Sequence, residues 1–342
     1  MRQVALAMLL GSCFVKPSPQ DHGTDGPVAD AAPDALVLPE GHNYMFVSTT
    51  TYPLTDAGTT TERMTNDCRA EALGHGLPGA ESFIALVSHT GDPPIQTRLG
   101  TASGFYRTDD RPIANELFQG GMFYPPSRTV SNVEIRTLVF TGLDPQGGPS
   151  ADCHTTAAGA FGFSYAVGTV WVSEEAARGC DAAAPVYCVG TMFQNTTISL
   201  PAVPASGKIA WLSTMTYDGK SPSDKTKCVA GGLSGFSLAY LSSGALLHVP
   251  TPAEWYRADG LDLGDDLESP LAPITTNANG APVADDQFAW FGGPTPGTKN
   301  CMDWQLGAVD TGLAISIVDP SPARGIIKQC DDDQRIVCFQ DP

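Results

Sequence analysis

The chain contains an internal duplication, and this repeat restricts the possible folds more than any other feature. Residues 46–52 (FVSTTTY) match residues 211–217 (WLSTMTY) position by position. The other matches keep the same order along the chain: residues 77–79 with 233–235, 84–88 with 238–242, 106–109 with 256–259, 140–142 with 290–292 and 186–188 with 336–338. A repeat of this kind predicts one structural domain that occurs twice.

The cysteines divide between the two copies in the same way. The sequence contains nine: Cys68, Cys153, Cys180 and Cys188 in the first copy, Cys228, Cys301, Cys330 and Cys338 in the second, and Cys13 outside both. None has the C-x-x-C spacing that is typical of zinc and redox sites, so we expect disulfides. Four cysteines allow three pairings in each copy, and the spacing does not choose among them.

Length and composition agree with two domains of mixed structure. The 342 residues accommodate two domains of about 150 residues each. Only 16% of the residues are charged, and 36 glycines with 28 prolines favour short strands and turns over long helices. The formal net charge of -18 offers no basic face for phosphates, so we expect no nucleic-acid partner.

The first residues resemble an export signal. Arg2 is followed by a short apolar stretch, residues 4–10, and then by Leu10-Gly11-Ser12-Cys13. These last four residues resemble the lipobox of bacterial lipoproteins, which implies that residues 1–12 are removed and that Cys13 is acylated. The alternative is a buried strand with a core cysteine. Since no run of about 18 apolar residues could span a bilayer, a lipid on Cys13 would be the membrane anchor.

The residues after this signal predict a tether. Residues 14–42 are rich in Pro, Ala, Asp and Gly without apolar periodicity, which is typical of a disordered segment with a reach of roughly 30 Å. We therefore expect a signal peptide at residues 1–12, a lipidated cysteine and disordered tether at 13–42, a first domain at 43–192, a linker at 193–207 and a second domain at 208–342.

Local signals place the first cysteine of each copy on a short helix. In the first copy, Thr59 and Glu62 have the spacing of a capping box, and three residues four apart share one helical face before Gly74: Met64, Cys68 and Ala72. In the second copy, residues 221–224 (SPSD) resemble a helix start ahead of Cys228. Strands are expected at residues 44–51, 83–87, 133–140, 210–213 and 238–241.

Together these elements resemble a known kind of domain. The opening strand, the cysteine helix, the Tyr-Arg-x-Asp segment, the Phe-x-Gly or Trp-x-Gly turn and the final Val-Cys or Tyr-Cys strand occur in order in both copies. The second copy adds Asn300-Cys301-Met302-Asp303-Trp304, where the first has Asp152-Cys153-His154. Over residues 43–342 the chain resembles the endostatin-like, C-type-lectin-like domains of bacterial surface lipoproteins.

This resemblance implies an α+β fold with two tandem lectin-like domains. Each would combine short helices with a twisted, mostly antiparallel sheet. The resemblance also implies that the first cysteine of each copy pairs with the fourth, and the second with the third. The implied disulfides are Cys68–Cys188, Cys153–Cys180, Cys228–Cys338 and Cys301–Cys330.

Two groups of residues in the second copy are candidates for a ligand site. An aromatic group would form a recognition surface if exposed, and the alternative is core packing: Trp255, Tyr256, Trp290 and Trp304. An acidic group could hold calcium, although it lacks EF-hand spacing, and the alternative is a solvated loop: Asp259, Asp262, Asp265, Asp266 and Glu268. The Glu-Pro-Asn, Gln-Pro-Asp and Trp-Asn-Asp motifs of calcium-dependent lectins do not occur, so no cofactor is assigned.

These patterns favour binding over catalysis. No G-x-S-x-G nucleophile motif occurs. We expect a non-enzymatic surface module, anchored to the membrane of a bacterial cell, that binds an extracellular carbohydrate, matrix or protein ligand through loops on a stapled scaffold. One alternative is a structural envelope protein without a specific ligand. Another is an enzyme on a lectin-like scaffold, which rests on fold analogy alone.

Overall fold

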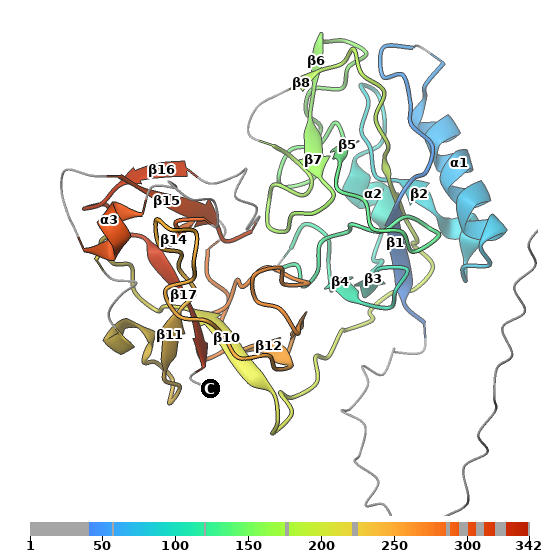
Figure 1. The fold of residues 1–342 in the computed structure, drawn as a ribbon. Helices are drawn as coiled ribbons and strands as arrows, with labels where there is room; N and C mark the ends of the chain where they lie inside the picture. The colour runs from blue at the N-terminus through green and yellow to red at the C-terminus, as the bar shows by residue number, and fades with distance from the viewer. Residues whose placement is uncertain are drawn as a thin grey trace, which may run out of the picture. The chain divides into compact units, whose positions relative to one another are not determined.

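Each copy of the repeat builds its own β-sheet (Figure 1). The computed structural model describes residues 41–56, 58–119, 121–174, 178–220, 225–284, 288–293, 300–305, 311–318 and 326–340. The predicted signal peptide, Cys13 and the tether as far as residue 40 lie outside these residues, as does the predicted helix start at 221–224. Short strands predominate and the helices are few, so the fold class is α+β, as the sequence predicts.

The first copy is organised around a five-stranded sheet. Its order is β2 (Ile84–Ala85), β9 (Tyr187–Val189), β1 (Asn43–Val47), β3 (Phe105–Tyr106) and β4 (Pro112–Ala114). β1 is central, parallel to β3 and antiparallel to β9. Two small ladders accompany this sheet: β5 (Leu138–Phe140) with β7 (Phe161–Phe163), and β6 (Ala158–Gly159) with β8 (Arg178–Gly179).

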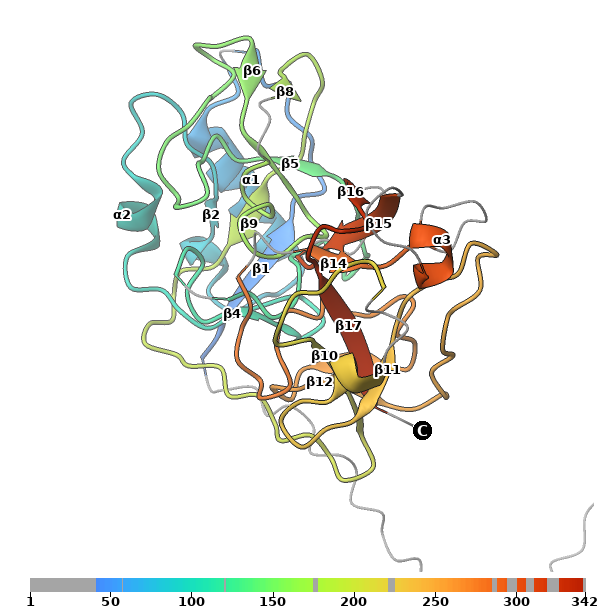
Figure 2. The same ribbon diagram turned by 90° about the vertical axis from the view of Figure 1, so that its left-hand side faces the viewer.

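The second copy repeats these pairings in one larger sheet. Its order is β13 (Asp262–Gly264), β12 (Trp255–Arg257), β10 (Lys208–Leu212), β17 (Arg335–Gln340), β14 (Phe288–Trp290), β15 (Thr311–Ser316) and β16 (Ile326–Gln329), and β11 (Gly235–Ser237) also pairs with β17. β10 is parallel to β12 and antiparallel to β17, as β1 is to β3 and β9. Figure 2 shows β10, β11, β12 and β17 lying together in this sheet.

The strand register confirms the sequence match of the first and last strands of the two copies and corrects the match of residues 84–88 with 238–242. Phe46 lies opposite Cys188 and Trp211 opposite Cys338, as the sequence match requires. The match of residues 84–88 with 238–242 is wrong by two residues, because Leu86 and Leu238 donate equivalent backbone bonds to β9 and β17. The strand predicted at 238–241 is accordingly β11, at Gly235–Ser237. A shift of two residues keeps every side chain on the same face, so the apolar pattern does not reveal it.

The helix of the first copy forms as predicted, with its start one residue later. α1 (Thr61–Gly74) buries Met64, Cys68 and Ala72 completely. Its cap is Thr60, whose side chain accepts a hydrogen bond from the Arg63 amide. The hydroxyl of Thr59 donates to the carbonyl of Pro53 instead.

In the second copy a 3-10 turn, η3 (Lys225–Cys228), carries Cys228. Other short helices in the described part of the chain are η1 (Ala80–Ser82), α2 (Ile95–Leu99) and α3 (Cys301–Trp304).

Four disulfides join these elements in the same way in both copies. They are Cys68–Cys188, Cys153–Cys180, Cys228–Cys338 and Cys301–Cys330, the pairs that the resemblance implies. The longer bridge of each copy spans 120 or 110 residues and ties its first helix to its last strand. On the chain-entropy argument, a bridge that closes a loop of this length destabilises the unfolded chain by about 5 kcal/mol.

The two copies also share buried contacts, and all described residues belong to one unit. One apolar cluster includes Phe105 and Trp171 of the first copy and Trp255 and Leu263 of the second. The hydroxyl of Tyr124 donates to the Asp262 carbonyl across this boundary, at 2.5 Å. The Val167 amide donates to the Val318 carbonyl at 3.1 Å. These contacts bring side chains of the two sequence repeats together in a common site.

A glycine lies against the shorter disulfide in each copy. A Cβ atom on Gly159 would lie 2.3 Å from the sulfur of Cys153, and one on Gly312 would lie 2.9 Å from the sulfur of Cys301. The two glycines occupy equivalent positions, because β6 and β7 together correspond to β15 in the strand pairing. Close approach to a bridge, rather than an unusual backbone angle, requires glycine here.

We expect Gly159→Ala to destabilise the protein by about 1–3 kcal/mol, because the added methyl group overpacks the space beside the sulfur. Gly74→Ala is the control, since Gly74 ends a helix and no atom lies within 4 Å of the place that its methyl group would take. It should leave stability unchanged or raise it by about 0.5–1 kcal/mol. Urea unfolding measures both, and equal midpoints for Gly159→Ala and the wild type would contradict the close contact.

Candidate functional site

The structure places most of the predicted aromatic group in the core. Trp255, Trp290 and Trp304 are 1%, 0% and 1% exposed, and Tyr256 is partly buried. The indole nitrogen of Trp290 donates to the Tyr217 carbonyl at 2.9 Å. Trp290 and Trp304 pack edge to face, with ring centroids 5.8 Å apart. Core packing, the alternative that the sequence left open, describes the three tryptophans, which therefore offer no exposed recognition surface.

Three members of the acidic group bond to other groups of the protein. Asp262 accepts from the Gly264 amide and lies 3.4 Å from Arg111, and Asp266 accepts from the Glu268 amide. Glu268 in turn accepts a hydrogen bond from the Tyr240 hydroxyl. Across the residues that the structure describes, which include this whole group, no three His, Cys, Asp or Glu side chains are arranged to hold a metal ion. The structure therefore lends no support to calcium binding here.

Of the other two members of the acidic group, Asp265 is exposed, and Asp259 belongs to a motif that both copies use structurally. Arg257 is 2% exposed, and its Nε and Nη2 donate to the two carboxylate oxygens of Asp259 at 2.9 and 2.7 Å. Arg107 is 3% exposed and makes the same forked pair with Asp109. Such a pair compensates a buried charge and fixes its geometry. The Tyr-Arg-x-Asp repeat is explained by this pair.

The Asn-Cys-x-x-Trp segment is also structural. All four residues of α3 have positive φ, between 51° and 64°, which is rare for residues with side chains. Asp303 accepts bonds from the Ser242 amide and the Asn300 side chain, which stabilise the turn together with the Cys301–Cys330 bridge. In the first copy Asp152 accepts the corresponding bond from the Thr90 amide. The first copy thus keeps the contact although it lacks the motif.

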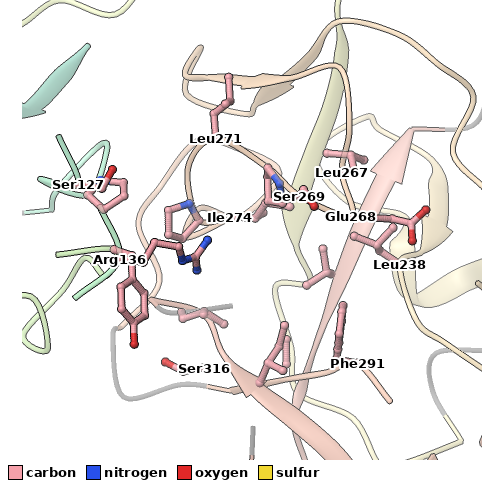
Figure 3. Close-up of a pocket in the computed structure, with 18 of the residues that line it drawn as sticks. Ser127, Arg136, Leu238, Leu267, Glu268, Ser269, Leu271, Ile274, Phe291 and Ser316 are labelled. Carbon is pink, nitrogen blue, oxygen red and sulfur yellow. The ribbon is translucent and has the colours of Figure 1, made fainter. Parts of the chain in front are cut away.

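The best candidate for a binding site is a cavity of about 570 Å³ lined by both copies (Figure 3). This volume lies within the range of small-molecule sites, roughly 300–1,000 Å³. Apolar residues of the second copy form one part of the lining: Leu238, Leu267, Leu271, Ile274, Ala289, Phe291, Ile315, Ile317 and Val337. Several of them lie on β14, β15 and β17 or on the segments next to these strands. The sheet of the second copy therefore forms the apolar floor of the cavity.

Charged and polar residues of the first copy face this floor. They are Arg107, Ser127, Arg128, Glu134, Arg136 and Tyr165. Figure 3 shows Arg136 extending toward the apolar residues, with Glu268 of the second copy on the opposite side. The sequence did not single out any of these residues except Glu268 and the paired Arg107. A cavity with an apolar floor and a few charged groups can both bury a ligand and orient it.

A second polar cluster lies beside the Cys153–Cys180 disulfide. The buried ring of His89 stacks on His154, with centroids 4.2 Å apart. Its Nδ1 lies 2.7 Å from the Thr61 hydroxyl, which donates its proton to Asp92 at 2.5 Å. Because that single proton is already committed, His89 must donate to Thr61, so the pair is not a nucleophile and its base.

Burial and the neighbouring His154 lower the pKa of His89, and they outweigh the opposite effects of Asp92 and Asp152. Burial would raise the pKa of the Asp152 carboxyl, but hydrogen bonds from Thr90 and Thr155 hold it well below its usual range. The cluster thus combines a neutral imidazole with an ionised carboxylate near neutral pH. It is a polar network that fastens the start of α1 to the loop after β2.

No protein-family model matches this chain, and no curated protein matches it either. The resemblance to endostatin-like domains therefore rests on the motifs of the chain alone and stays a hypothesis. Among the helices that the structure describes, none is long and apolar enough to cross a membrane.

We expect the free energy of unfolding to decrease as the pH falls below 6.5, the ordinary pKa of histidine. His89 is then protonated in the unfolded chain but not in the folded protein. The slope contributed by this group is at most about 1.4 kcal/mol per pH unit. Urea unfolding between about pH 7.5 and pH 5.5 should show a smaller loss for His89→Asn. The control His75→Asn changes an exposed histidine and should keep the wild-type pH dependence. Equal slopes for His89→Asn and the wild type would refute this assignment.

Proposed function

We propose that this protein is an exported, lipid-anchored binding protein, without enzymatic activity, that holds a small ligand in the cavity between two lectin-like copies. The observation that carries the proposal is the cavity itself, about 570 Å³ with an aliphatic floor and a charged rim. A structural envelope protein without a ligand has no need of such a space, since packed interiors leave few voids larger than a water molecule.

The chemistry of the cavity narrows the class of ligand. Sugars carry hydroxyl groups over most of their surface, and an aliphatic floor would leave those groups without hydrogen bonds. A partly apolar small molecule buries its carbon atoms against the leucines, isoleucines and valines of the second copy. Among the carbohydrate, matrix and protein ligands expected from the sequence, the cavity therefore favours an apolar portion of a ligand over a glycan.

Export is consistent with the disulfides. Four disulfides join all eight cysteines of the two copies, and such bridges persist in oxidising compartments outside the cytosol. Cys13 remains as the candidate for acylation, next to a segment with the composition of a tether. The proposal thus assigns one cysteine to anchoring and eight to stabilising the folded copies.

Binding of the uncharged dye Nile red tests the cavity, because its fluorescence rises in an apolar site. The full chain should bind it saturably, and Ser269→Trp, which places an indole on an exposed residue of the cavity lining, should weaken binding by about tenfold or more. The matched control Ser243→Trp changes an exposed serine outside the lining and should bind like the wild type. Absence of saturable binding to the wild type, or equal binding by Ser269→Trp, would reject the cavity as the ligand site.

Anchoring is tested by expressing the full chain in a bacterium with metabolic labelling by a fatty-acid analogue. The wild type should incorporate the label and partition with membranes, whereas Cys13→Ser should do neither, because the thiol is the only proposed acyl acceptor. Cys68→Ser is an unsuitable control since it breaks a disulfide, so Ser12→Ala, next to the acceptor, serves instead. Label on Cys13→Ser would show that the acyl acceptor lies elsewhere, and an unlabelled wild type would reject the lipid anchor.

A further inference from the structure

Of the three arginines that line the cavity, two lie beside carboxylates and one does not. Arg107 is paired with Asp109. Arg128 lies between two carboxylates, with Nε 3.5 Å from Asp109 and Nη2 3.7 Å from Glu134. Among the described residues, Arg136 makes no ion pair, although it lines the cavity and is exposed. The chain has a formal net charge of -18, yet none of its described carboxylates, including Glu134 and Glu268 of the same lining, makes an ion pair with Arg136.

The guanidinium of Arg136 is held in place rather than free to extend into solvent. Its central carbon lies 4.8 Å from the centroid of the Tyr165 ring, a cation–π contact that occupies one face of the group. The backbone is fixed on both sides, because the Ile135 amide donates to the Ser127 carbonyl and the Thr137 amide donates to the Ser164 hydroxyl. A guanidinium stacked on one face still presents its N–H groups along its edge.

The edge of a guanidinium matches a carboxylate. Two parallel N–H donors can bind both oxygens, and the pair is stronger near an apolar surface than in water. One uncompensated positive charge also matches one negative charge. A doubly charged phosphate would leave excess negative charge close to Glu134, which already shares the rim.

A negative charge on the opposite side of the cavity sets the orientation of the bound ligand. Glu268 lies there, and its carboxylate accepts a hydrogen bond from the buried hydroxyl of Tyr240. A second negative group would be repelled from this side, so the charged end of a ligand would face Arg136. The apolar residues Ile274, Leu238 and Phe291 line the same cavity (Figure 3). Their side chains offer carbon atoms, which favour packing against the hydrocarbon part of a ligand.

We infer that the cavity binds an aliphatic monocarboxylate, with its carboxylate on Arg136 and its hydrocarbon part on the apolar floor of the second copy. The inference rests on the proposed function and adds the chemical class of the ligand and the residue that selects it. Arg136 is thereby a ligand-binding residue, Tyr165 positions it, and the first copy contributes the charge while the second contributes the apolar surface.

Dodecanoate below its micelle concentration and dodecanol below its solubility limit provide the test, because they share one hydrocarbon chain and differ in charge. The full wild-type chain should bind dodecanoate at least about tenfold more tightly than dodecanol, as measured by displacement of Nile red. Arg136→Gln should reduce this ratio to about one while it leaves the affinity for dodecanol within about twofold of the wild type. Retained dodecanol binding also demonstrates that the variant is folded.

Arg178→Gln is the matched control, since it removes one positive charge from an exposed arginine that does not line the cavity. It should keep the wild-type ratio, which separates a local contact from the general effect of net charge. A wild-type ratio near one, or an unchanged ratio in Arg136→Gln, would overturn the inference even if both ligands bind. If Nile red itself does not bind, the proposed function fails first, so the two failures are distinguishable.

Discussion

The structure of each copy depends on the antiparallel pairing of its first strand with its last. β1 pairs with β9 and β10 with β17, and the longer disulfide fastens that last strand to the first helix of the same copy. The beginning and end of a copy are therefore neighbours, although more than 100 residues separate the bridged cysteines. A unit that closes on itself in this way can be duplicated in tandem without changing its internal topology.

The two copies use this frame differently, and the difference creates the candidate site. In the second copy β14, β15 and β16 extend the main sheet, and residues of the adjacent strands β17, β14 and β15 provide part of an apolar surface. In the first copy the corresponding strands form two small ladders beside the sheet. The segment at residues 125–136 carries Arg128 and Arg136, two of the three arginines that line the cavity. One copy thus supplies charge and the other supplies apolar area, which neither could combine alone.

The candidate site was not predictable from the sequence. The repeated motifs were recognisable because they have structural roles in both copies. Trp290, Asp259 and Asp303 stand in recognisable motifs because they pack, pair and hold turns in the frame. Arg136 and Phe291 both line the cavity although they are far apart in the chain, and Arg136 belongs to no motif. The sequence repeat marks residues that have the same structural role in both copies. A site formed between the copies uses different residues from each copy, so the repeat does not mark it.

By itself the sequence determined the duplication, the division of the cysteines, the α+β class and the buried face of α1. These properties follow from local spacing and from self-similarity, since a helix buries residues four apart wherever it lies. Tertiary structure alone decided the two-residue register of β11, the burial of the tryptophans and the compensation of Asp259 by Arg257. It also decided that Arg136 lines the cavity without an ion pair to any described carboxylate. Burial and charge compensation depend on which distant segments meet, and no local pattern records that.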